Sequence, residues 1–222
     1  MNTFNHKIKL SKELCELIGA YIGDGCLSNH NHGRTYDLQF SGHINLDYNY
    51  YKNLIAPIIK KLFNKEVSFI KIRNKKAFRM RCYSKEIGSF FMNRFNFILG
   101  KKTYIIKIPD EIMNSNKNYI YATVRGIFDT DGCIFFDKRK IYRKPYPRIT
   151  LQITSKNLQE QLKKILSVEF KIFTTINKRG VYCLEIYGYE QINKWMKIIG
   201  FSNEKHLNRL YAPVAQHGRA QV

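Results

Sequence analysis

The chain has 222 residues, of which 44% are hydrophobic and 14% aromatic, so its length and composition suit a folded core and argue against disorder. No apolar run is long enough to span a membrane, Met1 to Leu10 lacks the apolar stretch of a signal peptide, and the five dispersed cysteines argue against a zinc module or a disulfide framework. The 38 Lys and Arg against 17 Asp and Glu give a formal net charge of +21, which predicts nucleic acid as the partner and makes a membrane surface a poorer candidate.

The cysteines also indicate a reducing compartment, so we expect an intracellular protein, in the cytoplasm or nucleoid of a prokaryote or in an organelle. Lys, Asn and Ile are all abundant, and an AT-rich genome alone would raise the lysine content. Such a bias hardly explains the arginines on the predicted strands described below, which keeps nucleic acid as the favoured partner.

The predicted elements of the first half, residues 11–107, begin with a short helix that ends in Asp24-Gly25. A strand and a helix follow from Leu38, then two strands and a helix, over residues 67–73, 77–83 and 85–98. Residues 108–117, with Pro109 and the polar run NSNKN, are predicted to be a linker.

Residues 118–211 repeat this order, which indicates an internal duplication. A helix ends in Asp131-Gly132 and a strand and helix follow from Leu151, before two strands and a helix over residues 171–177, 181–188 and 189–199. A duplication of this kind predicts a pseudo-twofold molecule, in which a single chain does the work of a homodimer. Residues 212–222 break the composition of the rest and are predicted to be a tail.

The strands alternate between apolar and polar residues, which predicts a sheet with two different faces. In residues 77–83, Phe78, Met80 and Cys82 alternate with Arg79, Arg81 and Tyr83, and residues 147–153 alternate in the same way. We expect helices to cover the apolar face and the basic, polar face to stay open. An open face is often merely solvated, but its recurrence in both halves favours a binding surface.

The two Asp-Gly helix ends are the candidate site of chemistry. The negative end of a helix dipole disfavours a carboxylate, and two carboxylates brought together repel, so a hard divalent cation would relieve both effects. Gly19 and Gly23 on one helix, with Gly126 and Thr130 on the other, would let the helices approach closely and bring Asp24 and Asp131 together. The alternative, that each Asp-Gly is only a turn, is weakened by the repeat.

These two segments, LIGAYIGDG (residues 17–25) and VRGIFDTDG (residues 124–132), resemble the paired motifs of single-chain LAGLIDADG homing endonucleases. The resemblance extends over residues 11–211. It implies an α+β fold of two pseudo-symmetric αββαββα halves, whose antiparallel DNA-binding sheets are packed through the paired LAGLIDADG helices. Gly42 and Ser155 stand where some relatives carry a glutamine near the scissile phosphates, so the residues that assist catalysis stay open.

The resemblance also implies a set of functional residues. Asp24 and Asp131, with the backbone carbonyls of Gly23 and Thr130, would bind Mg²⁺, for which Mn²⁺ or Ca²⁺ could substitute in binding. The implied catalytic residues are these two aspartates and one lysine near the end of each half, Lys102 in the first and Lys205 in the second. Lys101 is a competing candidate for the place of Lys102.

The implied activity is hydrolysis of one phosphodiester per strand within a long asymmetric site of double-stranded DNA, about two helical turns in length, by a monomer. Arginines, lysines and glutamines on strands are expected to read bases, and those in turns to contact phosphates. The candidates are Arg34, Gln39, Lys71, Arg73, Arg79, Arg81, Arg139, Arg143, Arg148 and Gln152.

Two other functions fit the same scaffold. One is an RNA maturase, with host intron RNA as its partner, and the other is a DNA-binding regulator that does not cleave. Neither needs Asp24 and Asp131, so the presence of both aspartates favours a nuclease. The H-N-H sequence of residues 30–32 lacks the supporting ligands of another nuclease class and is interpreted as a polar loop.

Overall fold

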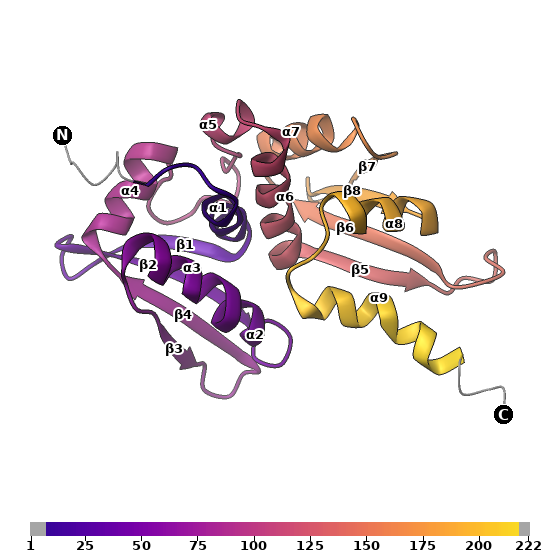
Figure 1. Ribbon diagram of the computed structural model, residues 1–222, viewed down its shortest axis with the longest axis horizontal. Coiled ribbons are helices and arrows are strands. Elements are labelled where there is room, and N and C mark those ends of the chain that lie inside the picture. The colour runs from indigo at the N-terminus through magenta and orange to yellow at the C-terminus, as the bar shows by residue number, and fades with distance from the viewer. Residues whose placement is uncertain (1–7, 218–222) are drawn as a thin grey trace.

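The computed structural model describes residues 8–217, with side chains for residues 8–211. The chain forms two similar halves, the first on the left of Figure 1 and the second on the right. The last helix, α9 (Glu204–His217), extends into the predicted tail, which starts at residue 212. The last five residues of the tail lie outside the described part of the chain, as do residues 1–7. Within residues 8–217, no helix combines the length and the apolar character that crossing a membrane requires.

The first half contains one four-stranded antiparallel sheet of order β1-β2-β4-β3. A helix with a π-helical turn in its middle, made of α2, η1 and α3, connects the two strand pairs. The elements are α1 (Lys12–Asp24), β1 (Gly25–His30), β2 (Thr35–His43), α2 (Tyr48–Tyr50), η1 (Tyr51–Ile55), α3 (Ala56–Phe63), β3 (Ser68–Lys71), β4 (Ala77–Tyr83) and α4 (Lys85–Phe95).

The second half repeats the arrangement with a sheet of order β5-β6-β8-β7, which confirms the predicted α+β fold of two αββαββα halves. Its elements are α6 (Lys117–Asp131), β5 (Gly132–Asp137), β6 (Tyr146–Ile153), α7 (Lys156–Leu166), β7 (Phe173–Ile176), β8 (Tyr182–Tyr187) and α8 (Tyr189–Ile198). A further helix, α9 (Glu204–His217), follows the repeat, where the sequence predicted only a lysine segment before the tail.

The segment predicted as a linker contains a short helix, α5 (Asp110–Met113). Ile108 and Ile112 are fully buried, and the side chain of Gln161 binds both backbone groups of Ile108, at 2.8 Å to its N–H and 3.0 Å to its carbonyl. The connection is therefore packed against α7 of the second half.

Helices α1 and α6 lie side by side at the centre of the molecule (Figure 1). A Cβ on Gly19 would overlap the carbonyl of Thr123 and come within 3.0 Å of the Cα of Gly126, and a Cβ on Gly126 would overlap the carbonyl of Glu16. The two helix backbones therefore touch, as the small residues predicted. Across the same interface Arg125 donates to the buried Glu16 carboxylate, Nε to Oε2 at 2.7 Å.

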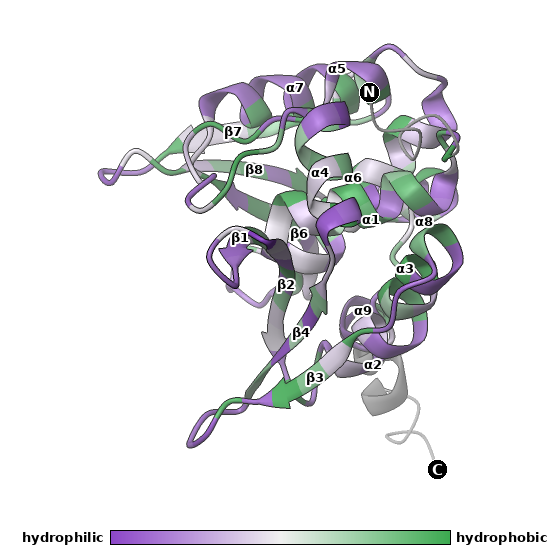
Figure 2. Cartoon of the chain, turned by 90° about the vertical axis from the view of Figure 1, so that its left-hand side faces the viewer, coloured by the Kyte–Doolittle hydropathy of each residue, from purple (hydrophilic) through white to green (hydrophobic). Residues whose placement is uncertain are grey.

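The two faces of each sheet differ as the alternation predicted. Phe78, Met80 and Cys82 are buried on the face that the helices cover, and Ile149, Leu151 and Ile153 take the same place in the second half. In Figure 2 the strands line the left of the molecule, while helices α3 and α8 lie to their right. The polar residues between the buried ones therefore face a side of the sheets that these helices do not cover.

Candidate functional site

Asp24 and Asp131 are the last residues of α1 and α6, and in each half the chain passes directly from the helix into a strand. The glycines that follow have ordinary backbone angles, φ −76° at both Gly25 and Gly132. They are required by space, because a Cβ on Gly25 would lie 2.6 Å from the Cα of Tyr21 and one on Gly132 would overlap the carbonyl of Phe128. This tight helix-to-strand junction fixes the direction of each aspartate.

The close approach of the helices brings the two aspartates to one place. A Cβ on Gly23 would overlap the hydroxyl of Thr130 and lie 3.4 Å from the carboxyl carbon of Asp131. The Asp131 carboxyl therefore lies against the residue that precedes Asp24. The structure thus places the two predicted metal-binding aspartates together at the helix interface.

The electrostatics of the pair favour a cation. Loss of water, and then the charge of Asp131, raise the pKa of Asp24 to about 7, although a hydrogen bond from Tyr51 opposes the shift. The Asp131 side chain is exposed, but the surrounding protein raises its pKa as well, against the influence of Lys102 and Lys205. Two carboxylates in such a setting are costly as anions, and a bound divalent cation would offset that cost.

The predicted lysines bind the predicted carbonyls. Nζ of Lys102 donates to the carbonyls of Ile22 at 2.6 Å and Gly23 at 2.9 Å, and Nζ of Lys205 donates to the carbonyl of Thr130 at 3.1 Å. Each half therefore combines an aspartate, the preceding carbonyl and a lysine. Lys101 is exposed and Lys102 half-buried, which favours Lys102 over its competitor.

The donor set fits Mg²⁺. Carboxylate and carbonyl oxygens are hard ligands, and Mg²⁺ commonly retains several waters and phosphate oxygens beside one or two carboxylates. Within residues 8–211, no group of three or more His, Cys, Asp or Glu is placed to hold a metal ion.

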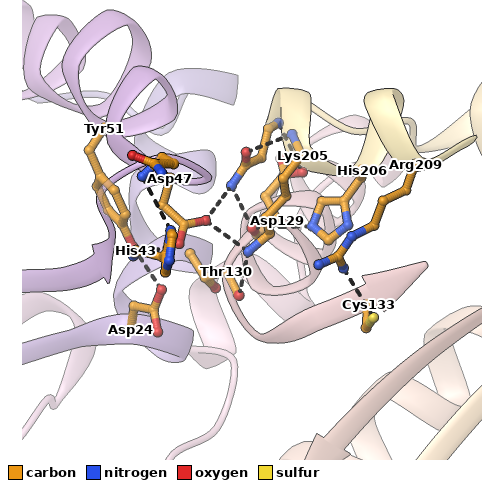
Figure 3. A network of polar contacts seen from close by, with 12 residues as sticks. Asp24, His43, Asp47, Tyr51, Asp129, Thr130, Cys133, Lys205, His206 and Arg209 are labelled. Atoms are coloured by element: carbon orange, nitrogen blue, oxygen red, sulfur yellow. Dashed lines mark hydrogen bonds and ion pairs between the residues drawn. The ribbon is translucent and has the colours of Figure 1, made fainter. Parts of the chain in front are cut away.

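Two residues that the sequence did not single out make the halves unequal (Figure 3). The hydroxyl of the buried Tyr51 donates to Asp24 at 3.0 Å, and the carboxylate of the buried Asp47 lies 2.9 Å from Nζ of Lys205. Lys102, by contrast, donates to the two carbonyls alone among the hydrogen bonds of the described residues. Asp47 and Tyr51 lie at the predicted strand-to-helix junction, where no sequence signal pointed to the site.

Asp129 is a third residue that the sequence did not single out, although it lies within the second motif. Its buried carboxylate accepts hydrogen bonds from the backbone N–H groups of Ser202 at 2.9 Å and Asn203 at 3.1 Å. Burial, and then the charge of Glu16, raise its pKa to about 8. Asp129 thus ties the end of α6 to the segment that carries Lys205.

Some of the predicted base-reading residues form ion pairs within the protein, and others are exposed on the open faces of the sheets without such a partner among the described residues. Arg79 is exposed and takes part in no ion pair within the described part of the chain, whereas Arg81 is paired with Asp37, Nη2 to Oδ2 at 2.5 Å. Gln39 and Gln152 lie on the open faces, half-buried and exposed respectively. Arg148 is half-buried and paired with Asp137, with Nη2 2.8 Å from Oδ2.

Lys71 corrects the predicted strand pattern. It lies opposite Phe78 in the register of β3 and β4, so it shares the face that the helices cover, at the exposed end of the edge strand. The alternation places Ser68 and Ile70 on the open face instead. Four of the predicted DNA-binding arginines lie in loops, and of these Arg139 is paired with Asp137 at 2.7 Å. The other three are exposed in the turns between strands, at Arg34, Arg73 and Arg143.

Residues 118–200 match the sequence model of the LAGLIDADG-like domain. The chain is 26% identical over 157 residues to a DNA polymerase of Thermococcus hydrothermalis, which covers 71% of this chain and 8% of the polymerase. It is 25% identical over 210 residues to the DNA-directed RNA polymerase subunit Rpo1C of Methanocaldococcus jannaschii, which covers 92% of this chain and 21% of the subunit. The chain spans less than a quarter of the length of either relative.

Solved structures share the arrangement of the whole chain. The homing endonuclease I-DmoI in complex with DNA and Mn gives a TM-score of 0.62 at 19% identity, covering 88% of this chain and 99% of that one. The I-LtrWI LAGLIDADG homing endonuclease bound to target DNA gives 0.59 at 11% identity, covering 96% and 92%. This chain therefore has the fold of the single-chain LAGLIDADG homing endonucleases, with a LAGLIDADG-like domain in its second half, and the resemblance predicted from the two motifs is confirmed.

Proposed function

We propose that this protein is a site-specific endonuclease that cuts both strands of double-stranded DNA. The observation that carries the proposal is the meeting of Asp24 and Asp131 at the touching ends of α1 and α6, each beside a carbonyl that a lysine binds. The fold supports it, because I-DmoI has been crystallised with its target DNA and with Mn, Ca or Mg. Mg²⁺ is the proposed cofactor.

In the proposed site, Asp24 and Asp131 with the carbonyls of Gly23 and Thr130 would hold divalent cations. When bound, such cations supply Lewis-acid stabilisation of the leaving oxygen and activation of water. The protein positions these oxygens through the two helix-to-strand junctions.

The lysines have a separate role in the proposal. Lys102 and Lys205 place positive charge beside the carbonyls, where a scissile phosphate would lie. Burial lowers the pKa of Lys102. Lys205 is paired with Asp47, with Nζ 2.9 Å from Oδ1.

The open sheet faces are the proposed DNA-reading surface. A two-stranded ribbon or sheet edge fits the major groove of B-DNA, and each half would follow about one helical turn. The two halves carry different residues at matched positions, so the target should be asymmetric. Exposed loop residues such as Arg34, Arg73 and Arg143 would contact phosphates beside the groove.

The test is cleavage of a randomised duplex library in Mg²⁺ by the wild type and by Asp24→Asn and Asp131→Asn. We expect cutting at one asymmetric site, lost by at least a hundredfold in either variant, while binding in Ca²⁺ persists. Binding without cutting by the wild type in Mg²⁺ or Mn²⁺ would contradict the nuclease and favour the non-cleaving regulator.

A further inference from the structure

The open faces of the two sheets carry different chemistry at matched positions. The glycines after the two aspartates align the sheets: Gly25 lies opposite Phe40 and Gly132 opposite Leu151, so Gln39 corresponds to Thr150. In the first sheet Gln39 lies opposite Arg81, whereas in the second sheet Thr150 lies opposite Glu185. The second sheet thus lacks the arginine that the first sheet carries at this position.

Aromatic residues take the place of free arginines on the second sheet. Phe135 lies opposite Arg148 and Phe173 lies opposite Glu185, so both belong to the open face. Both are exposed, Phe135 by 39% and Phe173 by 47%. Phe173 stacks on Tyr187 with ring centroids 4.4 Å apart and 16° between the planes, which holds one of these rings in a fixed position.

Arg148, the one arginine on the strands of this open face, is engaged within the protein. Its Nη2 lies 2.8 Å from Asp137 and donates to the hydroxyl of Tyr142 at 3.1 Å, and its guanidinium carbon lies 4.7 Å from the centre of the Tyr187 ring. Its Nη1 is 3.9 Å from Glu185, and its side chain is only 13% exposed. Reading a guanine would require it to leave an ion pair that is already shielded from water.

The open face of the first sheet carries a free arginine and, among its strand residues, no phenylalanine; its exposed apolar side chains there are Ile70 and Tyr83. Arg79 is exposed and belongs to no ion pair among residues 8–211, and it lies opposite the exposed Ser41 on the open face. Gln39 stands nearby on the same face. Arginine pairs with the O6 and N7 of guanine and glutamine with adenine, whereas phenylalanine contacts the methyl group of thymine.

We propose that the two halves read DNA by different chemistry: the second sheet recognises thymine methyl groups through Phe135 and Phe173, and Arg79 of the first sheet reads guanine. In this division Arg148 is a structural residue that holds the second sheet together. The inference rests on the proposed DNA binding and adds what each half-site must contain. One half-site is rich in thymine, and the other contains guanine.

The experiment measures binding, not cleavage. Duplexes bound in Ca²⁺ are selected from a random library and sequenced, and thymine is then replaced by deoxyuracil, which lacks only the methyl group, in one half-site at a time. We expect deoxyuracil to weaken binding by about threefold to fivefold per contacted methyl in the thymine-rich half-site, since a buried methyl group contributes about that factor. The same replacement in the other half-site should leave affinity unchanged.

Variants assign the effect to residues. In Phe135→Ala and Phe173→Ala the penalty for deoxyuracil should disappear at the contacted thymines, and Arg79→Ala should lose its preference for guanine in the other half-site. Arg148→Gln should lower the melting temperature and leave base preference in its own half-site unchanged. Thermal unfolding of each variant separates loss of contact from loss of folding.

The outcomes distinguish the inference from the proposed function. A guanine preference in the second half-site that Arg148→Gln abolishes, or deoxyuracil that is tolerated everywhere, would overturn the division between the halves and leave DNA binding intact. Selection of no duplex at all would overturn both.

Discussion

At the scale of single residues, the site is pseudo-symmetric in its aspartates and lysines and asymmetric in what holds them. Asp24 accepts a hydrogen bond from Tyr51, and Lys205 is paired with Asp47. Asn203 donates to the same Asp47 carboxylate at 3.0 Å, so a residue of the first half fixes the lysine of the second. In the proposed endonuclease, the two centres should therefore differ in the rate at which they cut their strands.

We predict that Tyr51→Phe slows cutting of one strand by about tenfold to a hundredfold, because a hydrogen bond to an ionised group contributes about 1.5–3 kcal/mol. The measurement is a time course on a duplex labelled on both strands, in which a nicked intermediate should accumulate. The matched control is Tyr50→Phe, since the buried Tyr50 hydroxyl has no hydrogen-bond partner in the structure. Equal slowing of both strands would contradict the assignment of Tyr51 to Asp24.

His206 makes stability depend on pH. Burial, and then the nearby charge of Lys205, lower the pKa of His206 from 6.5 to about 3. Between these pH values the unfolded chain binds a proton at this residue and the folded chain does not. The stabilising contribution is complete above pH 6.5 and is lost as pH falls, by about 2 kcal/mol at pH 5. The raised pKa values of Asp24 and Asp129 act in the opposite direction over the same range, so the His206 contribution is measured as a difference between the wild type and a His206 variant in urea unfolding at pH 7 and pH 5.

The same titration has a paired control. Relative to the wild type, His206→Gln should gain about 2 kcal/mol of stability at pH 5 compared with pH 7, whereas substitution of the exposed turn residue His32 by Gln should leave the pH dependence of the wild type unchanged. An unchanged pH dependence in the His206 variant would show that other groups carry it.

At the scale of secondary-structure elements, the α1–α6 interface is the feature on which the site depends. The helices end in Asp-Gly and their backbones touch, so a displacement of either helix separates the carboxylates. The ion pair of Glu16 with Arg125 lies in the same interface, and burial outweighs the arginine's charge to raise the pKa of Glu16. The interface therefore combines close packing with a costly buried charge.

We predict that Gly126→Ala lowers the free energy of unfolding by about 3 kcal/mol, because the added methyl group meets backbone atoms of α1 that cannot rotate away. The check is chemical denaturation, with cleavage assayed on the folded fraction. Gly33→Asn is the control, since Gly33 has open space around it and a φ of +81° that asparagine tolerates. A Gly126 variant as stable as the control would contradict a backbone contact here.

At the scale of the whole molecule, the positive charge of the protein and the open faces of its two sheets predict DNA binding that salt weakens. With a net charge of +21, the protein should lose about a thousandfold in affinity between 50 and 200 mM salt if it contacts about six phosphates. Arg143→Ala, in the exposed loop between β5 and β6, should reduce the slope of log affinity against log salt by about one.

The measurement is fluorescence anisotropy with a labelled target duplex across salt concentrations. Arg148→Gln serves as the contrasting variant. The Arg148 side chain is only 13% exposed and lies between Asp137 and Glu185, so we expect this substitution to leave the slope unchanged. A slope near zero in the wild type would contradict binding through phosphates.

The sequence by itself determined the duplication and the sheets with one apolar and one polar face. It also selected Asp24 and Asp131 as the candidate metal-binding residues. These follow from local periodicity and from glycines whose spacing constrains neighbouring backbone. Lys102 and Lys205 were predicted from the resemblance, and the structure places both on the carbonyls before the aspartates.

Only the tertiary structure decided which charges are free. Asp47, which precedes α2, and Tyr51, at the start of η1, reach the site from a segment in which no sequence pattern pointed to it. Arg148 was predicted to read bases, although Asp137 and its neighbours hold it. Lys71 of β3 lies opposite Phe78 of β4, and because opposite residues share a face, Lys71 lies on the face that the helices cover. A strand pattern shows which way a side chain points, but ion pairs form between residues far apart in the chain, and only the folded arrangement brings those together.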